Sequence, residues 1–256
     1  MSDIAFNSVG LSYGAYAAIR NVSFELPRGQ FVALVGPTGC GKSSLLNLVA
    51  GLLKPSAGTV CCEGRAVEST NRNAAYMFQS DALLPWKTAM ENIMFGPLLR
   101  GVSKIEAAKQ ADVWLDRVGL RSFGGRYPSQ LSGGQRKRVA MAQALINRPP
   151  ILLMDESFSA LDVQTRALME TLLLELWQEL QATVLFVTHD LEEAIAMADR
   201  LLLMSAGPGA TVKADYPVRL PRPRNVAEAR FIPGFAELYG TIWHNLKEEV
   251  MSTYGR

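Results

Sequence analysis

An eight-residue stretch near the N-terminus constrains the fold more than any other part of the chain: Gly36-Pro37-Thr38-Gly39-Cys40-Gly41-Lys42-Ser43. It matches the spacing G-x-x-x-x-G-K-[ST]. It lies between an apolar run, 31–35, and a helix-like stretch, 44–50, that Gly51 can end. A buried strand, a glycine-rich turn and a helix N-terminus surround an anion with backbone N–H groups at the positive end of the helix dipole. The stretch therefore predicts a site for nucleotide phosphates.

Two side chains of this loop have expected roles of their own. We expect Lys42 to reach the β and γ phosphates, and the Ser43 hydroxyl to ligate Mg²⁺. The glycines are needed because side chains would block the approach of the backbone to the phosphates. The alternative is a chance match in an ordinary glycine-containing turn, and the strand before it and the helix after it count against that alternative.

Composition describes an ordinary globular protein. The chain has 256 residues, of which 48% are hydrophobic and 20% charged, enough for one large or two small domains. A net charge of +2 gives no support for nucleic-acid binding. Two short basic clusters, 136–138 and 219–224, are expected from charge alone to be solvated surfaces.

The cysteines and the apolar runs limit the cellular compartments and the membrane topology that the chain can have. Cys40, Cys61 and Cys62 make neither a disulfide framework nor a metal-ligand spacing, which fits a reducing compartment. Cys40 lies close to the positive end of the expected helix, so we predict a reactive thiol there. The N-terminus lacks the plan of a signal peptide, and no run of 18 apolar residues is present. We therefore expect a chain that does not span a membrane by itself but can attach to one through a partner.

Strand-like and helix-like stretches alternate along the chain. Strands are predicted at 4–6, 10–13, 19–26, 58–63, 74–78, 151–154 and 183–187. Helices are predicted within 83–125, at 164–181, at 191–198, and at a final amphipathic stretch marked by Phe235, Leu238, Ile242 and Leu246. Buried strands that alternate with helices indicate an α/β fold with a parallel sheet and right-handed crossovers, here with some antiparallel strand near the start. We expect a domain at 1–214 with a helical subdomain inserted at about 83–145, then a proline-containing connection and a helix at 215–256.

Acidic residues follow one of the predicted buried strands. Asp155 and Glu156 come directly after 151–154. An aspartate at this place can hold Mg²⁺, and an adjacent carboxylate can polarise a water in line with the γ phosphate. A helix-capping or turn pair is the alternative. His189 follows the strand at 183–187, at the edge where open α/β sheets bind ligands, although a lone histidine is more often a solvated or core residue. His244 has no such context, and we expect it at the surface.

A second glycine-rich turn, Leu131-Ser132-Gly133-Gly134-Gln135, precedes another helix-like stretch. It is either an ordinary helix start or a second anion-binding helix N-terminus. Two phosphate-binding turns in one chain would be unusual, unless the second turn serves the nucleotide of another subunit.

The same turn resembles the signature sequence of ATP-binding cassette (ABC) proteins, and further family motifs occur in order over roughly 13–189. Tyr13 is similar to the aromatic residue that stacks on adenine, with Tyr16 as the second candidate. Gln79 is similar to the glutamine that senses Mg²⁺ and the attacking water, and His189 to the histidine that contacts the γ phosphate. Residues 159–162 resemble the loop after the carboxylate strand. The resemblance implies a P-loop NTPase (RecA-like) core with a parallel sheet, an N-terminal antiparallel β part and an inserted helical subdomain.

The resemblance also implies a shared site for ATP and Mg²⁺, because two cassettes of this family dimerise head to tail. The catalytic residues would be Glu156, His189, Lys42 and Gln79. The metal ligands would be Ser43, Gln79 and Asp155. ATP would be held by Tyr13, Gly36, Pro37, Thr38, Gly39, Cys40, Gly41, Lys42, Ser43 and Ser44 of one copy, and by Ser132, Gly133, Gly134 and Gln135 of the other. Asp162 would also belong to the nucleotide site and would communicate across the dimer.

Finer likeness points to one group within the family. Residues 79–86, 91–93 and 220–224 look like those of the ATPase subunits for nitrate, sulfonate and taurine import. That likeness implies a homodimer, or a pair with a related cassette, held on integral membrane permease subunits at the cytoplasmic face of the membrane. An extracytoplasmic solute-binding protein would take part indirectly, and no nucleic acid would bind. The alternative is a cassette ATPase of translation or DNA repair, without a membrane partner.

Two positions depart from the family pattern. Ser157 stands where the family usually has proline after the catalytic glutamate, and Lys137 stands where it commonly has glutamine. We expect a local loop change at Ser157, and little effect of Lys137 on the nucleotide.

Overall fold

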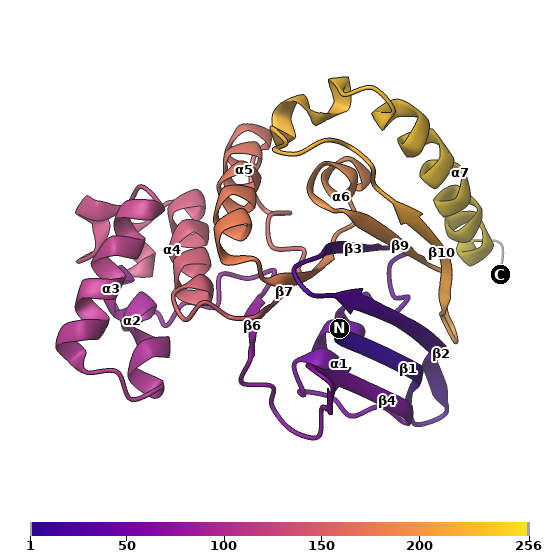
Figure 1. The fold of residues 1–256 in the computed structure, drawn as a ribbon, viewed down its shortest axis with the longest axis horizontal. Coiled ribbons are helices and arrows are strands. Elements are labelled where there is room, and N and C mark those ends of the chain that lie inside the picture. Colours follow the sequence, from indigo (N-terminus) through magenta and orange to yellow (C-terminus); the bar gives the residue numbers. More distant parts are fainter. Residues whose placement is uncertain (1, 255–256) are drawn as a thin grey trace.

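The computed structural model describes residues 2–254, and a mixed six-stranded sheet lies at their centre (Figure 1). Its strand order is β10-β9-β3-β8-β7-β6, with β10 antiparallel to β9 and the other neighbours parallel. The bounds are β3 Phe31–Val35, β6 Ala74–Met77, β7 Ile151–Asp155, β8 Thr183–Val187, β9 Arg200–Met204 and β10 Val212–Pro217. β3, β8 and all but the last residue of β7 are buried, as continuous apolar runs predict for strands covered on both faces. The sequence-based prediction of an α/β fold with a parallel sheet is confirmed.

A second, antiparallel sheet is formed mainly by the N-terminal part of the chain. Its order is β2-β1-β4-β5, with bounds β1 Ser2–Tyr13, β2 Tyr16–Pro27, β4 Ala57–Cys62 and β5 Arg65–Ala66. The short strands predicted at 4–6 and 10–13 are one strand, because β-bulges rather than breaks accommodate the irregular residues between Phe6 and Leu11. Helix α1, Lys42–Val49, packs between the two sheets in one hydrophobic cluster that contains Phe6, Leu45 and Leu185.

The other helices lie beside the central sheet and at the two ends of the molecule (Figure 1). α2 Ala89–Leu99, α3 Lys104–Arg117 and α4 Gly133–Leu145 lie together at one end of the molecule (Figure 1). α5 Val163–Leu180 and α6 Leu191–Met197 follow β7 and β8, and α7 Phe235–Tyr254 lies at the other end. Short 3-10 helices connect them at Arg121–Phe123, Pro128–Gln130 and Val226–Phe231.

Side-chain caps define where several helices begin. Thr88 and Ser132 each form a reciprocal capping box with the residue three positions on, and Asp162 and Asp190 accept backbone N–H groups of α5 and α6. Each cap satisfies N–H groups that have no partner within the helix, so these boundaries are set locally by sequence.

The C-terminal part is more regular and more buried than predicted. β9 and β10 were not expected, and the predicted domain boundary after residue 214 falls within β10. Val218 and Phe235 join the same hydrophobic cluster as Phe186 of the central sheet. α7 packs on the fold through Phe235 and Ile242, as its apolar stripe predicts. The division at 214 stays a prediction.

The expectation of a solvated basic surface at 219–224 is wrong for its last residue. The Arg224 side chain is buried, and its guanidinium donates hydrogen bonds to Ile195, Ala196 and Ala198 carbonyls at the end of α6 and to those of Val218, Leu220 and Pro221. The last carbonyls of a helix have no partner within it, and a buried arginine can supply several donors at once. Residue charge alone could not reveal this environment.

No helix within the described residues combines the length and apolarity needed to cross a membrane.

Candidate functional site

The phosphate loop connects β3 to α1, as predicted. The Lys42 ammonium folds back over the loop and donates to the carbonyls of Gly36 at 2.8 Å and Pro37 at 2.9 Å. Gly41 has φ +94°, and a Cβ there would lie 2.8 Å from Cγ1 of Ile19. Glycine is therefore required at this position both for its backbone conformation and for the close approach of β2.

Cys40 in the same loop is fully buried, and burial raises the pKa of its thiol despite the neighbouring Lys42 ammonium. The prediction of a reactive thiol is therefore wrong for this conformation, because desolvation of the thiolate outweighs the favourable charge.

A carboxylate meets the loop from the neighbouring strand. The Ser43 hydroxyl donates to Oδ1 of Asp155 at 2.9 Å, and the Tyr76 hydroxyl donates to Oδ2 at 3.3 Å. Burial raises the pKa of Asp155, with the hydrogen bonds from Ser43 and Tyr76 working against it. A partly desolvated carboxylate beside a hydroxyl is a set of oxygen ligands suited to Mg²⁺. Two of the three predicted metal ligands are therefore neighbours, and no hydrogen bond within residues 2–254 joins the third, Gln79, to either of them.

Gln79 instead contacts the second carboxylate. Its Nε2 donates to Oε2 of Glu156 at 3.3 Å, and Nδ1 of His189 lies 3.2 Å from the same oxygen. The three side chains come from the ends of β6, β7 and β8, which are neighbours in the sheet although far apart in sequence. Glu156 has φ +43°, a conformation that non-glycine residues adopt at a cost and that is frequent at functional sites.

The two tyrosine candidates are equally exposed, at 51% for Tyr13 and 50% for Tyr16. The Tyr13 hydroxyl lies 3.4 Å from Oγ of Ser44, which follows the phosphate loop. The Tyr16 hydroxyl lies beside Gly207, which itself lies close to the carbonyl of Gly39 in the loop. Tyr13 thus has a direct side-chain contact next to the loop, and its role with adenine stays a prediction.

The second glycine-rich turn lies on the helical side of the molecule. Ser132 caps α4, and Gly134 approaches Thr165 so closely that a Cβ would lie 2.8 Å from Cγ2 of that residue. Ser132 to Gln135 and Asp162 line one open hollow of about 500 Å³. The Asp162 side chain accepts from the Thr165 N–H and so caps α5. Within residues 2–254, no hydrogen bond joins this turn to the phosphate loop.

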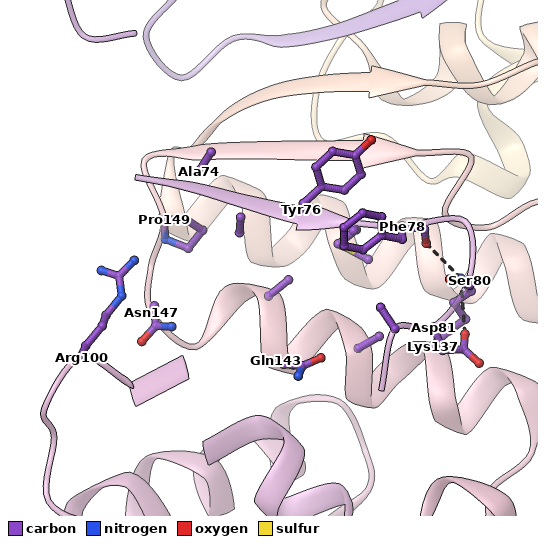
Figure 2. Close-up of a pocket in the computed structure, with 15 residues that line it drawn as sticks. Ala74, Tyr76, Phe78, Ser80, Asp81, Arg100, Lys137, Gln143, Asn147 and Pro149 are labelled. Carbon is purple, nitrogen blue, oxygen red and sulfur yellow. Dashed lines mark hydrogen bonds and ion pairs between the residues drawn. The ribbon is translucent and has the colours of Figure 1, made fainter. Parts of the chain in front are cut away.

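Sequence reasoning missed the surroundings of Lys137. The expectation of a solvated surface at 136–138 is wrong for Lys137, whose side chain is 5% exposed. The Arg136 side chain is 37% exposed, and both residues pair with Asp81. Lys137 lines a pocket of about 300 Å³ between β6 and α4, where Figure 2 places it beside Asp81. His244, in contrast, is exposed as predicted, and it lies near Glu248.

The P-loop core, the antiparallel sheet and the helical group define an ATP-binding cassette. Residues 19–159 match the model of the ABC transporter family, and the chain belongs to that family. It is therefore an ATP-binding protein and an ATPase.

Named relatives give the finer likeness. The chain is 47% identical to the aliphatic sulfonates import ATP-binding protein of Burkholderia lata, over 90% of this chain and 70% of that protein. It is 42% identical to the nitrate import ATP-binding protein of Synechocystis, over 81% and 78% respectively. It is 43% identical to the taurine import ATP-binding protein of Escherichia coli, over 78% and 79%. The predicted resemblance to this group of ABC ATPases is confirmed.

Solved cassettes have the same fold. The dimeric structure of MJ0796, a bacterial ABC transporter cassette, is 32% identical, covers 84% of this chain and 99% of that one, and superposes with a TM-score of 0.75.

Proposed function

We propose that this chain is the ATP-hydrolysing subunit of a membrane importer for a small anionic solute of the nitrate, sulfonate or taurine kind. The likeness to three relatives named for such imports supports the class of solute. The chain would lie at the cytoplasmic face of the membrane, bound to integral permease subunits, with an extracytoplasmic protein delivering the solute. The observation that carries the hydrolytic part is the convergence of Gln79 and His189 on one oxygen of Glu156.

Glu156 is the proposed general base. Both contacts fall on its Oε2, so Oε1 remains to accept a proton from the attacking water. As the water oxygen bonds to the γ phosphorus, its proton passes to Glu156 and the β–γ bridging oxygen leaves with ADP. His189 and Gln79 hold the carboxylate in place during this transfer.

Lys42 and the backbone N–H groups of the loop would oppose the charge on the phosphates. Once ATP is present, phosphate oxygens replace the carbonyls of Gly36 and Pro37 as acceptors for the Lys42 ammonium. Ser43 and Asp155 would hold Mg²⁺, with Gln79 as the third predicted ligand. When bound there, Mg²⁺ would supply further positive charge against the negative charge of the phosphates.

We infer that two copies, or this chain and a related cassette, enclose each ATP head to tail. Ser132 to Gln135 lies on the helical side, apart from the phosphate loop of its own copy. In a site completed by the partner, this turn would bind the phosphates of the partner's nucleotide, and Asp162 would lie at the interface. The dimeric cassette structures of relatives support the arrangement.

The test is Glu156→Gln. We expect ATP binding within about twofold of wild type and steady-state hydrolysis lowered by at least about a hundredfold, the usual contribution of a general base. ATP should also convert the variant to a dimer on size-exclusion chromatography with light scattering. Glu228→Gln, an exposed position on the 3-10 helix before α7, is the matched control and should behave as wild type. Turnover near the wild-type rate in Glu156→Gln would disprove the assignment.

The transport role needs a separate observation. Purification from membranes together with a polytopic permease is expected. Stable isolation without any membrane protein, combined with normal ATPase activity, would favour the non-transport cassette class instead.

A further inference from the structure

The two positions that depart from the family pattern contact the same short backbone segment, residues 77–79. This segment begins at the end of β6 and carries Gln79. β6 is the edge strand of the sheet, and its last pairing with β7 joins Met77 to Met154. Beyond Met77 no strand ladder fixes the backbone, so other groups must hold it.

Ser157 holds the segment from the side of Glu156. Its side chain is fully buried, and its hydroxyl donates to the carbonyl of Met77 at 2.9 Å. Proline, the usual family residue here, has no side-chain donor, so this hydrogen bond is specific to serine. Because Ser157 directly follows Glu156, it connects the Gln79 segment to the proposed base.

Lys137 holds the segment from the side of α4. Its ammonium donates to the carbonyl of Gln79 at 2.6 Å and to that of Phe78 at 3.4 Å, and lies 3.4 Å from Oδ1 of Asp81 (Figure 2). Three donors thus meet three acceptors, which accounts for a buried lysine. Asp81 is also paired with Arg136 at 2.8 Å, so Lys137 is not needed to balance its charge.

Three consecutive carbonyls are thereby fixed from two directions, while the Gln79 side chain reaches Glu156. We propose that Lys137 and Ser157 are positioning residues, which together hold residues 77–79 so that the Gln79 amide stays in contact with Glu156. This inference rests on the proposed function, since it assigns the two residues to hydrolysis through Gln79. Within residues 2–254, neither side chain forms a hydrogen bond or ion pair with the phosphate loop, so neither should affect ATP affinity.

The test uses Lys137→Met and Ser157→Ala, each made in the wild-type chain and in Gln79→Ala. Methionine has nearly the length of lysine without its donors, and alanine removes only the hydroxyl. We expect each single change to lower kcat about tenfold, equivalent to about 1.4 kcal/mol, with the Kd for a fluorescent ATP analogue within about twofold of wild type. Gln79→Ala should itself lower kcat. In that background neither change should lower kcat further, because the Gln79 amide through which both residues act is absent.

Arg148→Met is the control, since Arg148 lies just beyond α4 and its one ion-pair partner among residues 2–254 is the exposed Glu179. It should keep the wild-type kcat in both backgrounds. The inference is overturned if the single changes leave kcat unchanged, if Gln79→Ala has the wild-type kcat, or if the same tenfold loss recurs in Gln79→Ala. Glu156→Gln separates the two proposals: if it abolishes turnover while Lys137→Met and Ser157→Ala hydrolyse normally, only the positioning role fails. If Glu156→Gln retains turnover, the proposed function itself fails.

Discussion

Replacement of Arg224 by methionine is the sharpest test of how the C-terminal part is attached. The side chain is 1% exposed and donates to six carbonyls, of which Ala198 at 2.6 Å and Leu220 at 2.9 Å are the closest. Its nearest carboxylate oxygen, on Asp199, lies 4.0 Å away. Arg224 therefore acts mainly as a donor to backbone carbonyls rather than as half of an ion pair.

The expected cost follows from these contacts. A hydrogen bond from a charged donor contributes about 1.5–3 kcal/mol, so the two short ones contribute about 3–6 kcal/mol. Burial works against this gain, and it lowers the pKa of Arg224 to about 10. We expect Arg224→Met to lose about 3 kcal/mol of unfolding free energy, the lower end of the range, because unpaired carbonyls remain in the core.

Urea unfolding followed by tryptophan fluorescence measures the loss, and thermal unfolding should show a melting temperature lower by about 6–12 °C for a chain of this size. Arg219→Met is the matched control: Arg219 lies in the same segment but is exposed, and its replacement should stay within about 0.5 kcal/mol of wild type. Equal stability of the two variants would refute the reasoning.

Two further predictions concern titrating groups. Maleimide at neutral pH should label Cys61, which is partly exposed, well before Cys40, which is buried and has a raised thiol pKa. Peptide mass spectrometry measures the labelling at each cysteine. Preferential labelling of Cys40 in the folded protein would contradict the burial of its thiol in the loop. Burial and the neighbouring Glu193 raise the pKa of Glu170 from 4.5 to about 9. Between pH 4.5 and about pH 9 the folded chain therefore binds more protons than the unfolded chain, so the free energy of unfolding should fall as the pH rises through this range. Glu170→Gln should flatten that decline in urea unfolding measured at several pH values, and an unchanged slope would show that the buried pair does not titrate in this way.

The sequence predicted the parts of the site that are built locally. The strand at 31–35, the glycine turn and the helix that follows are contiguous, so spacing and residue type suffice to predict them. The same holds for Ser132, whose cap involves a residue three positions away, and for Asp155, which ends an apolar run. Their order along the chain was enough to identify the family.

Only the tertiary structure decided which of these parts meet. Ser43 bonds to Asp155 across 112 residues, and Gln79 reaches Glu156 across 77. The burial of individual side chains likewise depends on segments that are remote in sequence. Lys137 and Arg224 carry charges that favour a solvated position, yet each is enclosed because unpaired backbone carbonyls from remote segments surround it. The solvent exposure of a charged side chain depends on the segments that pack around it, and the local sequence does not contain that information. For this reason, charge alone predicted the wrong environment for both residues.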